Sequence, residues 1–521
     1  MVGQIVERMK ADQLIRQQQQ GSGRPIVALQ HEGRQLVAVR NRLFWSSKWK
    51  TFPDFLADYM KTILDPAWGN AEIAKPLAER HTIMQWYDAY CRYQQTCIKT
   101  PGEVASSEVT GVVACYLGLA YSLYLLDHNV ELQQRLVKRL KDPGQFQGAY
   151  YETIVANVLI RAGFELALLD EAKRGSRHCE FTAVSKASGK RYWIEAKMRA
   201  VAGLLGRTER DGTTDPDPLS KLVTHVADAL GKPAEDERII FVDLNAEMEP
   251  PKDKGERPAF MDGMNARLER YERTQLPKGE KAYVIVTNFA FHRRLDKLVT
   301  CFAAPFGLGM PEFNRSGLYR HSDWYRQERD HADAIRICEA IESFLRFPST
   351  FDGSLPSEAF GRESSRVLIG ETYSFGKEGI VGTVTSATVN EAEKTMYIAI
   401  MTPEGVGQIH TQPMTDAELQ DYRRHPEAYF GRVQPVSKRA DTPQELFKFF
   451  MDAHRGLSRD ALLQRVAGWP NFAQLKEMGD DDLLAEFCEG MVASFQASEA
   501  GRVAASQSRA EPPAGTQPIA E

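Results

Sequence analysis

The sequence predicts an α/β protein with a mixed central sheet and flanking helices, together with a mainly helical N-terminal domain and a small C-terminal β unit followed by helices. Three observations predict this organisation. Between residues 145 and 290, helical patterns and short apolar strands follow one another in the order αβββαβαβ. Residues 1–141 are mainly helical in pattern, and residues 366–411 alternate apolar and polar side chains between turns.

Composition limits the class of protein. The chain has 521 residues, a formal net charge of −5, 43% hydrophobic residues and 26% charged residues. These values are ordinary for a globular protein and exclude global disorder, a collagen-like fibre and a polytopic membrane protein. Seven cysteines occur without C-x-x-C spacing, which excludes a zinc ribbon and predicts reduced thiols in a cytoplasmic protein.

The first 141 residues are expected to form one domain. Residues 1–23 lack an apolar core and predict a charged helix or a frayed arm, not a signal peptide. A hairpin is expected over residues 26–44, followed by helices at about 53–64, 71–99, 105–127 and 130–141. Residues 110–126 carry no charge, but acidic rather than basic residues flank them, so a buried helix is favoured over membrane anchoring.

The segment 142–350 is expected to be the α/β domain with a helical extension. After the turn Asp142-Pro143-Gly144, a helix is predicted from about 145 to 162. Three strands follow, Phe164–Leu169, His178–Ser185 and Arg191–Met198, and Ser188-Gly189-Lys190 joins the last two as a hairpin. Further elements are predicted at 219–230 (helix), 238–244 (strand), 258–275 (helix), 281–287 (strand) and 328–346 (helix).

The C-terminal part is expected to hold a β unit and helices over residues 351–495 and a disordered tail over 496–521. Strands are predicted at Val367–Glu371, Gly379–Thr388, Thr395–Met401 and Gly407–Thr411. Capping boxes at Thr415 and Thr442 predict two helix starts. The tail is rich in Ala, Ser, Pro and Gly, which cannot form a packed core.

One strand carries charged side chains on a single face. In Tyr192–Arg199, Glu195 and Lys197 point to the same side because side chains alternate along a strand. The predicted hairpin brings Glu180 near Glu195, and Glu152 lies on the preceding helix. Three carboxylates and one ammonium in this arrangement suit a Mg²⁺ or Mn²⁺ ion, which would activate water and stabilise charge on a phosphoryl group. Taken singly, each residue is better explained structurally, with Glu180, Glu195 and Lys197 as exposed strand residues and Glu152 as a helix former.

Together, Glu195-Ala196-Lys197, Glu180, the helix carrying Glu152 and the αβββαβ order resemble the PD-(D/E)XK nuclease superfamily, which has the restriction-endonuclease-like fold. The resemblance covers roughly residues 145–290. It implies that Glu180 and Glu195 are metal ligands, that Lys197 is the catalytic lysine and that Glu152 is an accessory acid. The first acid of the family is most often Asp, whereas this chain has Glu180, one methylene longer.

Basic residues near these acids predict a local nucleic-acid surface. Residues 173–210 contain ten basic and three acidic residues, although five more acids lie within 170–217. The expected nucleic-acid contacts are Lys186, Lys190, Arg191 and Arg199. His225, on the helix after the loop, is expected to be a helix-surface residue rather than part of the site.

Two functional hypotheses follow. The first is a metal-dependent nuclease acting on nucleic acid, with DNA expected before RNA, and with protein contacts through the N- or C-terminal regions. The second is a catalytically inert protein of the same fold that serves as a nucleic-acid-binding or protein-interaction scaffold. A membrane-associated protein anchored through residues 110–126 is a third and disfavoured hypothesis.

Overall fold

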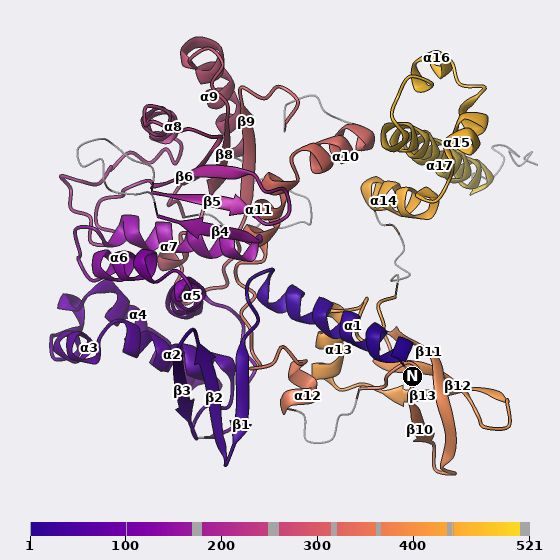
Figure 1. The fold of residues 1–521 in the computed structure, drawn as a ribbon, viewed down its shortest axis with the longest axis horizontal. Coiled ribbons are helices and arrows are strands. Elements are labelled where there is room, and N and C mark those ends of the chain that lie inside the picture. Colours follow the sequence, from indigo (N-terminus) through magenta and orange to yellow (C-terminus); the bar gives the residue numbers. More distant parts are fainter. Residues whose placement is uncertain are drawn as a thin grey trace, which may run out of the picture. The chain divides into compact units, whose positions relative to one another are not determined.

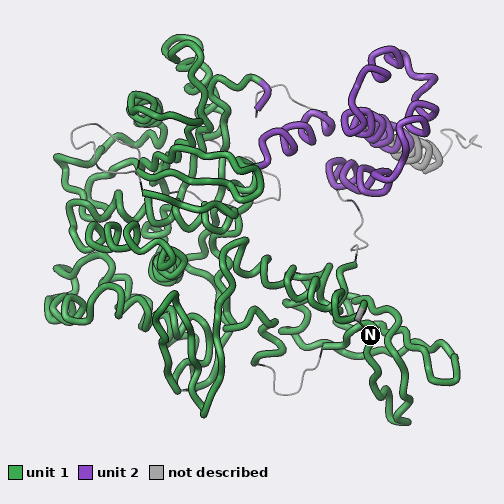
Figure 2. Tube along the Cα trace, viewed as in Figure 1, with its two compact units in different colours: residues 1–311, 333–436 green, residues 312–332, 437–521 purple. Residues whose placement is uncertain are grey.

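The computed structural model describes residues 2–100, 102–168, 180–247, 260–313, 320–360, 366–434, 440 and 442–510, with the side chains of Val2 and of 499–510 left aside. The chain forms two compact units (Figure 2). The first contains residues 1–311 and 333–436, and the second contains residues 312–332 and 437–521. Each unit is described separately below.

The central sheet of the first unit has six strands in the order β4-β5-β6-β7-β8-β9 (Figure 1). The first three are antiparallel neighbours, β7 and β8 run parallel to β6, and β9 returns antiparallel to β8. The predicted mixed sheet is confirmed, while β9 was not expected from the sequence. The strands are β4 (Phe164–Ala167), β5 (Phe181–Ser185), β6 (Arg191–Met198), β7 (Arg238–Asp243), β8 (Ala282–Thr287) and β9 (Ala303–Leu308).

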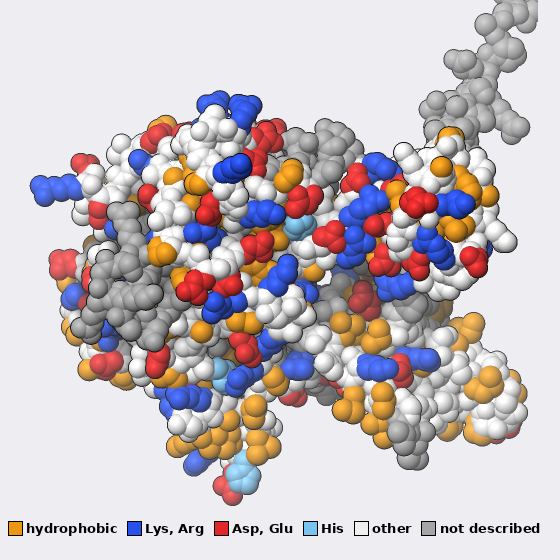
Figure 3. Space-filling model, turned by 45° about the horizontal axis from the view of Figure 1, so that its top comes forward, with side chains coloured by type: hydrophobic (Ala, Val, Ile, Leu, Met, Phe, Trp, Pro, Cys, Tyr) orange, Lys and Arg blue, Asp and Glu red, His pale blue; other side chains and the backbone are white. Residues whose placement is uncertain are grey.

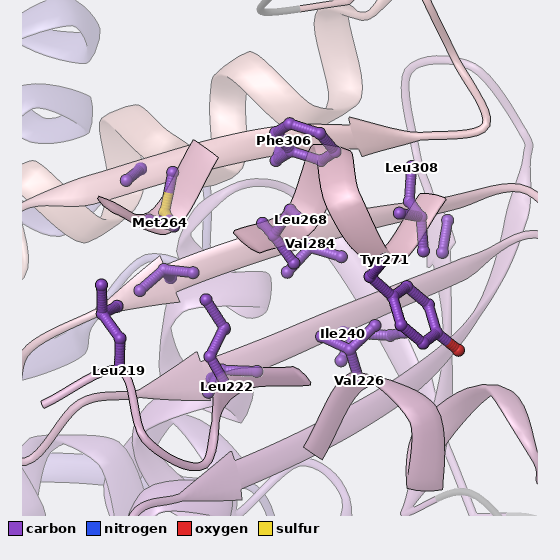
Figure 4. Packing of buried hydrophobic residues seen from close by; sticks show 14 of the residues in the cluster. Leu219, Leu222, Val226, Ile240, Met264, Leu268, Tyr271, Val284, Phe306 and Leu308 are labelled. Carbon is purple, nitrogen blue, oxygen red and sulfur yellow. The ribbon is translucent and has the colours of Figure 1, made fainter. Parts of the chain in front are cut away.

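Helices cover both faces of this sheet. On one face, α8 (Leu222–Leu230) and α9 (Phe260–Gln275) pack apolar side chains onto β7, β8 and β9 (Figure 4). On the other face lies α7 (Phe146–Arg161), whose Tyr151 hydroxyl is 2.8 Å from Thr287 Oγ1. Burying a side chain of the size of Leu or Phe contributes roughly 1.5–3 kcal/mol, so this two-sided packing fixes the position of β6 within the sheet.

The helices that precede the sheet form a layer around one wholly buried helix, α5 (Gly111–Leu126). It packs against α2, α4 and α7, as expected for a buried helix rather than a membrane anchor. Within the described ranges, no helix is long and apolar enough to cross a membrane. The other helices here are α2 (Phe52–Ile63), α3 (Pro66–Ile73), η1 (Leu77–Glu79), α4 (Thr82–Cys97) and α6 (Val130–Leu140), so the single helix expected over 71–99 is two helices.

A three-stranded antiparallel sheet replaces the simple hairpin expected at residues 26–44. It consists of β1 (Val27–His31), β2 (Arg34–Val39) and β3 (Arg42–Ser46). Glu32 and Gly33 adopt positive φ in the tight turn between β1 and β2, a conformation that two-residue hairpin turns require. One face packs onto α2 through Phe44, while the other leaves apolar side chains exposed, namely Val27, Leu29, Leu43 and Trp45.

The C-terminal part of the first unit is a four-stranded antiparallel sheet packed against the N-terminal helix. Ala11 and Ile15 of α1 (Val2–Gln20) are buried in the same cluster as Ile398, so the expectation of a frayed arm is wrong. The expected strand at Val367–Glu371 is also wrong, because the first strand begins at Thr372. The strands are β10 (Thr372–Phe375), β11 (Ile380–Asn390), β12 (Thr395–Met401) and β13 (Gly407–Pro413), and the helices are α12 (Pro356–Phe360) and α13 (Asp416–Arg424). The first unit also contains η2 (Phe291–Arg293), between β8 and β9, and all of α11 (Ala332–Glu342) except its first residue.

The second unit is helical. Its core joins α14 (Pro443–His454), α15 (Arg459–Val466), α16 (Phe472–Leu475) and α17 (Asp480–Ala510), and α10 (His321–Asp330) is tied to α17 by Arg326 and Glu486 at 2.6 Å. Both capping boxes predicted from the sequence are present, at Thr415 and Thr442. Because α17 extends to Ala510, helix continues into the expected tail, and residues 511–521 lie outside the described part.

Candidate functional site

The hairpin of β5 and β6 sets the geometry of the candidate site. Phe181 pairs with Ile194, and the Glu180 amide continues the ladder by donating to the Ile194 carbonyl at 3.1 Å. Glu180 therefore lies beside Glu195 and immediately precedes the first residue of β5. The positive φ of Gly189 closes the turn that produces this register.

The two faces of β6 differ as the alternation predicts. Ile194 and Met198 are buried on the side of α7, whereas Glu195 and Lys197 lie level with Ile240 and Val242 on the opposite side. On that side, α8 packs against Ile240 and Val242 of the neighbouring strand β7. Glu195 is consequently a fully buried carboxylate on a central strand, with 0% of its side chain exposed, and such a group needs a charged partner.

Lys197 is one such partner. Its Nζ lies 3.3 Å from Glu180 Oε1 and 3.1 Å from Glu195 Oε2, so two carboxylates from neighbouring strands share one ammonium. Burial lowers the pKa of Lys197, but the carboxylates of Glu195 and Glu180 outweigh burial and hold that pKa above its ordinary value. Lys197 therefore remains charged over the physiological range.

A second lysine reaches the same carboxylate. Lys232 Nζ lies 2.7 Å and 2.9 Å from the two oxygens of Glu195, and 3.9 Å from Glu180 Oε1. It follows Gly231, the C-cap of α8, in the connection to β7. Lys232 has no distinct signal in the sequence, because a lysine after a helix-ending glycine is ordinary and only the fold brings it back to β6.

Glu152 lies near this pair but is already engaged. Its two oxygens accept hydrogen bonds from the Arg139 guanidinium, with Arg139 Nη2 at 2.8 Å from Glu152 Oε1. Burial raises the pKa of Glu152, the negative charge of Glu180 raises it further, and Arg139 and Lys197 oppose this. The three predicted acids are thus brought together, with Glu152 held by a forked ion pair.

His225 of α8 also turns toward the site, contrary to the expectation of a helix-surface residue. Burial lowers the pKa of His225 to about 4, and the positive charge of Lys197 adds to the effect. Its Nε2 is buried, and no hydrogen-bond partner for it is found in the described part of the chain. The imidazole is therefore neutral at pH 7.

The residues predicted to contact nucleic acid do not gather here. Lys186, Lys190 and Arg191 lie at the turn end of the hairpin, about 20 Å along β6 from Lys197 at about 3.3 Å per residue. Arg191 pairs there with Asp236 at 2.6 Å, and Lys186 lies 3.6 Å from Glu165. On the face shown in Figure 3, basic and acidic side chains are intermixed and form no continuous basic surface.

Arg199 is the exception, since it lies at the Lys197 end of the strand. However, it is buried and donates to the backbone carbonyls of Leu244, at 3.5 Å, and of Asp215. These contacts fix the loop after β6 against the end of β7. Arg199 therefore acts as a structural anchor in this arrangement.

The donor chemistry of the site suits Mg²⁺ or Mn²⁺. Glu180 and Glu195 already converge on one cationic centre, and hard divalent ions such as Mg²⁺ commonly take one or two carboxylates and keep several waters. Among the residues described, no group of three or more His, Cys, Asp and Glu side chains is arranged to hold a metal. The two glutamates would thus be the side-chain ligands, with water and substrate completing the shell.

A cleft of about 1550 Å³ elsewhere in the first unit contains none of the site residues and is lined by Lys50, Tyr90, Arg424 and other residues. It therefore adds nothing to the chemistry of the glutamate–lysine cluster. Comparison of the chain with protein-family models, with curated proteins and with solved structures gives no match.

Proposed function

We propose that this protein is a metal-dependent nuclease of the PD-(D/E)XK superfamily, which hydrolyses phosphodiester bonds in nucleic acid, with DNA expected before RNA. The observation that carries the proposal is the sharing of one ammonium, that of Lys197, by Glu180 and Glu195. The succession α7-β4-β5-β6-α8-β7, with β6 and β7 parallel, is consistent with a restriction-endonuclease-like domain. A cytoplasmic location is part of the same proposal.

Each residue has a role that its contacts suggest. Glu180 and Glu195 would hold the cation, and Lys197 would donate hydrogen bonds to the attacking water or to a non-bridging phosphate oxygen. When bound, a divalent cation lowers the pKa of a coordinated water and offsets charge on the phosphate. Arg139 holds Glu152 in place as an accessory acid near Glu180.

A specific observation favours the second hypothesis, an inert scaffold of the same fold. Both oxygens of Glu195 are engaged by Lys232, and three carboxylates in the cluster face three cations, Arg139, Lys197 and Lys232. A charge-balanced cluster of this kind stabilises a fold without any catalytic task. The protein would then bind nucleic acid or another protein through surfaces outside the cluster.

A cleavage assay tests the proposal. The full-length protein is incubated with single- and double-stranded DNA and RNA, with Mg²⁺ or Mn²⁺ or with EDTA. Lys197→Met and Glu195→Gln are each expected to lower the cleavage rate about a thousandfold, because each removes a group required in the transition state. Glu165→Gln, which changes an exposed carboxylate on β4, serves as the matched control and should cleave like the wild type.

Two results would contradict a nuclease function. One is cleavage that persists in EDTA or in both site variants, which would indicate a contaminating or unrelated activity. The other is a folded wild-type protein that cleaves none of the four substrates with either metal. Binding of the same nucleic acids without cleavage would favour the scaffold.

A further inference from the structure

Lys232 blocks the carboxylate that the proposed metal site needs. Its ammonium contacts both Glu195 oxygens, at 2.7 Å and 2.9 Å, whereas the Lys197 ammonium lies 3.1 Å from Oε2. A divalent cation binds through a carboxylate oxygen at about 2.0–2.6 Å, and the positive charges of the cation and an adjacent ammonium repel each other. Lys232 and a cation therefore compete for Glu195.

We propose that Lys232 is a displaceable counter-ion, which neutralises Glu195 while the site holds no divalent cation and leaves Glu195 when the cation and a phosphate-bearing substrate bind. This inference rests on the proposed function and describes how the same site is regulated. It implies that nucleic acid promotes metal binding, because the substrate phosphate attracts Lys232 away from Glu195.

The attachment of Lys232 supports displacement of its side chain alone. The Lys232 carbonyl accepts a hydrogen bond from Arg238 Nη2 at 2.8 Å, so the backbone is tied to β7. The side chain beyond it is a flexible four-carbon stem carrying a point charge. The ammonium can therefore swing outward while the connection between α8 and β7 stays in place.

Lys197 is placed differently from Lys232 in the cluster. It projects from the middle of the sheet between two carboxylates, and its backbone is paired with β7. Adding a divalent cation to three acids and three bases leaves a net charge of +2 in the cluster unless one cation moves away or a phosphate arrives. Metal and substrate binding are therefore coupled, and reciprocal coupling is a thermodynamic requirement.

Mn²⁺ binding to the full-length protein, measured by electron paramagnetic resonance, tests the proposal without relying on activity. Lys232→Met removes the charge and keeps the stem, and we expect it to bind Mn²⁺ about tenfold more tightly than the wild type, within the usual range of coupling between sites. Lys232→Arg places a forked guanidinium on Glu195 and should bind Mn²⁺ more weakly. Lys281→Met makes the same change at an exposed lysine directly before β8 and should bind like the wild type.

A second arm adds a duplex DNA oligonucleotide with phosphorothioate linkages that resist cleavage. DNA is expected to tighten Mn²⁺ binding to the wild type several-fold and to change the affinity of Lys232→Met much less. Thermal unfolding provides a further readout. Lys232→Met should melt below the wild type in EDTA, and Mn²⁺ should raise its melting temperature more than that of the wild type, since a ligand that binds the native state stabilises it.

The outcomes separate this inference from the proposed function. Equal Mn²⁺ affinities for the wild type and Lys232→Met would overturn the displacement of Lys232 and leave the nuclease proposal standing. No Mn²⁺ binding by any variant, with or without DNA, would overturn both. If Lys232→Met does not fold, Lys232→Arg decides, because an affinity equal to or greater than that of the wild type would refute competition for Glu195.

Discussion

Two glutamates in one cluster are neutralised in different ways. Glu152, on α7, is held by a single guanidinium that donates to both carboxylate oxygens, whereas Glu195, on β6, is shared by the ammonium groups of Lys197 and Lys232. Both side chains are almost fully buried. The two glutamates therefore differ in the chemistry of their cationic partners and not in how deeply their carboxylates are buried.

The cationic partner of each glutamate determines the role of that end of the cluster. A guanidinium fork matches a carboxylate in one planar geometry, so the Arg139–Glu152 pair joins α6 to α7 as a fixed link. An ammonium is a point charge on a flexible stem and can be exchanged for another cation. The Glu152 end of the cluster is therefore suited to a structural role, and the Glu195 end is suited to binding a cation.

The largest expected effect concerns the fixed link. Arg139→Met leaves Glu152 buried without its cation, and we expect it to lower the free energy of unfolding by about 3–5 kcal/mol, as for other broken buried pairs. Urea unfolding at pH 7 measures this, with Lys138→Met, an exposed neighbour on α6, as the control. A loss below about 1 kcal/mol would mean that Glu152 is satisfied by other groups and that the two ends of the cluster do not differ.

A smaller effect is expected from pH at the Glu195 end. The pKa of His225 is about 4 in the folded protein, against 6.5 for an unperturbed histidine, because of burial and the charge of Lys197. The unfolded chain therefore binds more protons between these values. The contribution of His225 to stability is complete above pH 6.5 and is lost as the pH falls toward 4.

His225→Gln isolates that contribution. The wild type should lose more stability than the variant between pH 6.5 and pH 4 in urea unfolding, while above pH 7 the difference between them should be constant. Parallel pH profiles would show that His225 titrates as it does in the unfolded chain and is not held against Lys197. The difference between the Glu152 and Glu195 ends of the cluster would then depend on Lys197 and Lys232 alone.

Local patterns in the sequence were sufficient for part of the fold and site. Alternation along Arg191–Met198 placed Glu195 and Lys197 on one face, and the turn at Gly189 placed Glu180 beside them. The mixed sheet and the buried helix α5 were predicted from apolar patterning in the same way. The signals for all of these features are patterns of side chains within short stretches of the sequence.

Contacts between distant segments were not predictable. Lys232 reaches Glu195 only because the connection from α8 to β7 brings it back beside β6, and Ala11 of α1 packs beside β12 across most of the chain length. The strand β9 carries Pro305 and Gly307, which weaken a strand pattern, and it forms by pairing with β8. These features follow from tertiary packing, for which the local sequence contains no distinct signal.

The smallest effect is expected at the turn end of β6, where the sequence predicted nucleic-acid contacts. Lys190 is exposed and about 20 Å along the strand from Lys197, which exceeds the screening length of about 8 Å at physiological ionic strength. Lys190→Glu should therefore change the cleavage rate and the Mn²⁺ affinity less than twofold at 150 mM salt. A tenfold loss of cleavage with unchanged Mn²⁺ affinity would place the path of the nucleic acid over the hairpin, and basic residues remote from the cluster would then contribute to substrate binding.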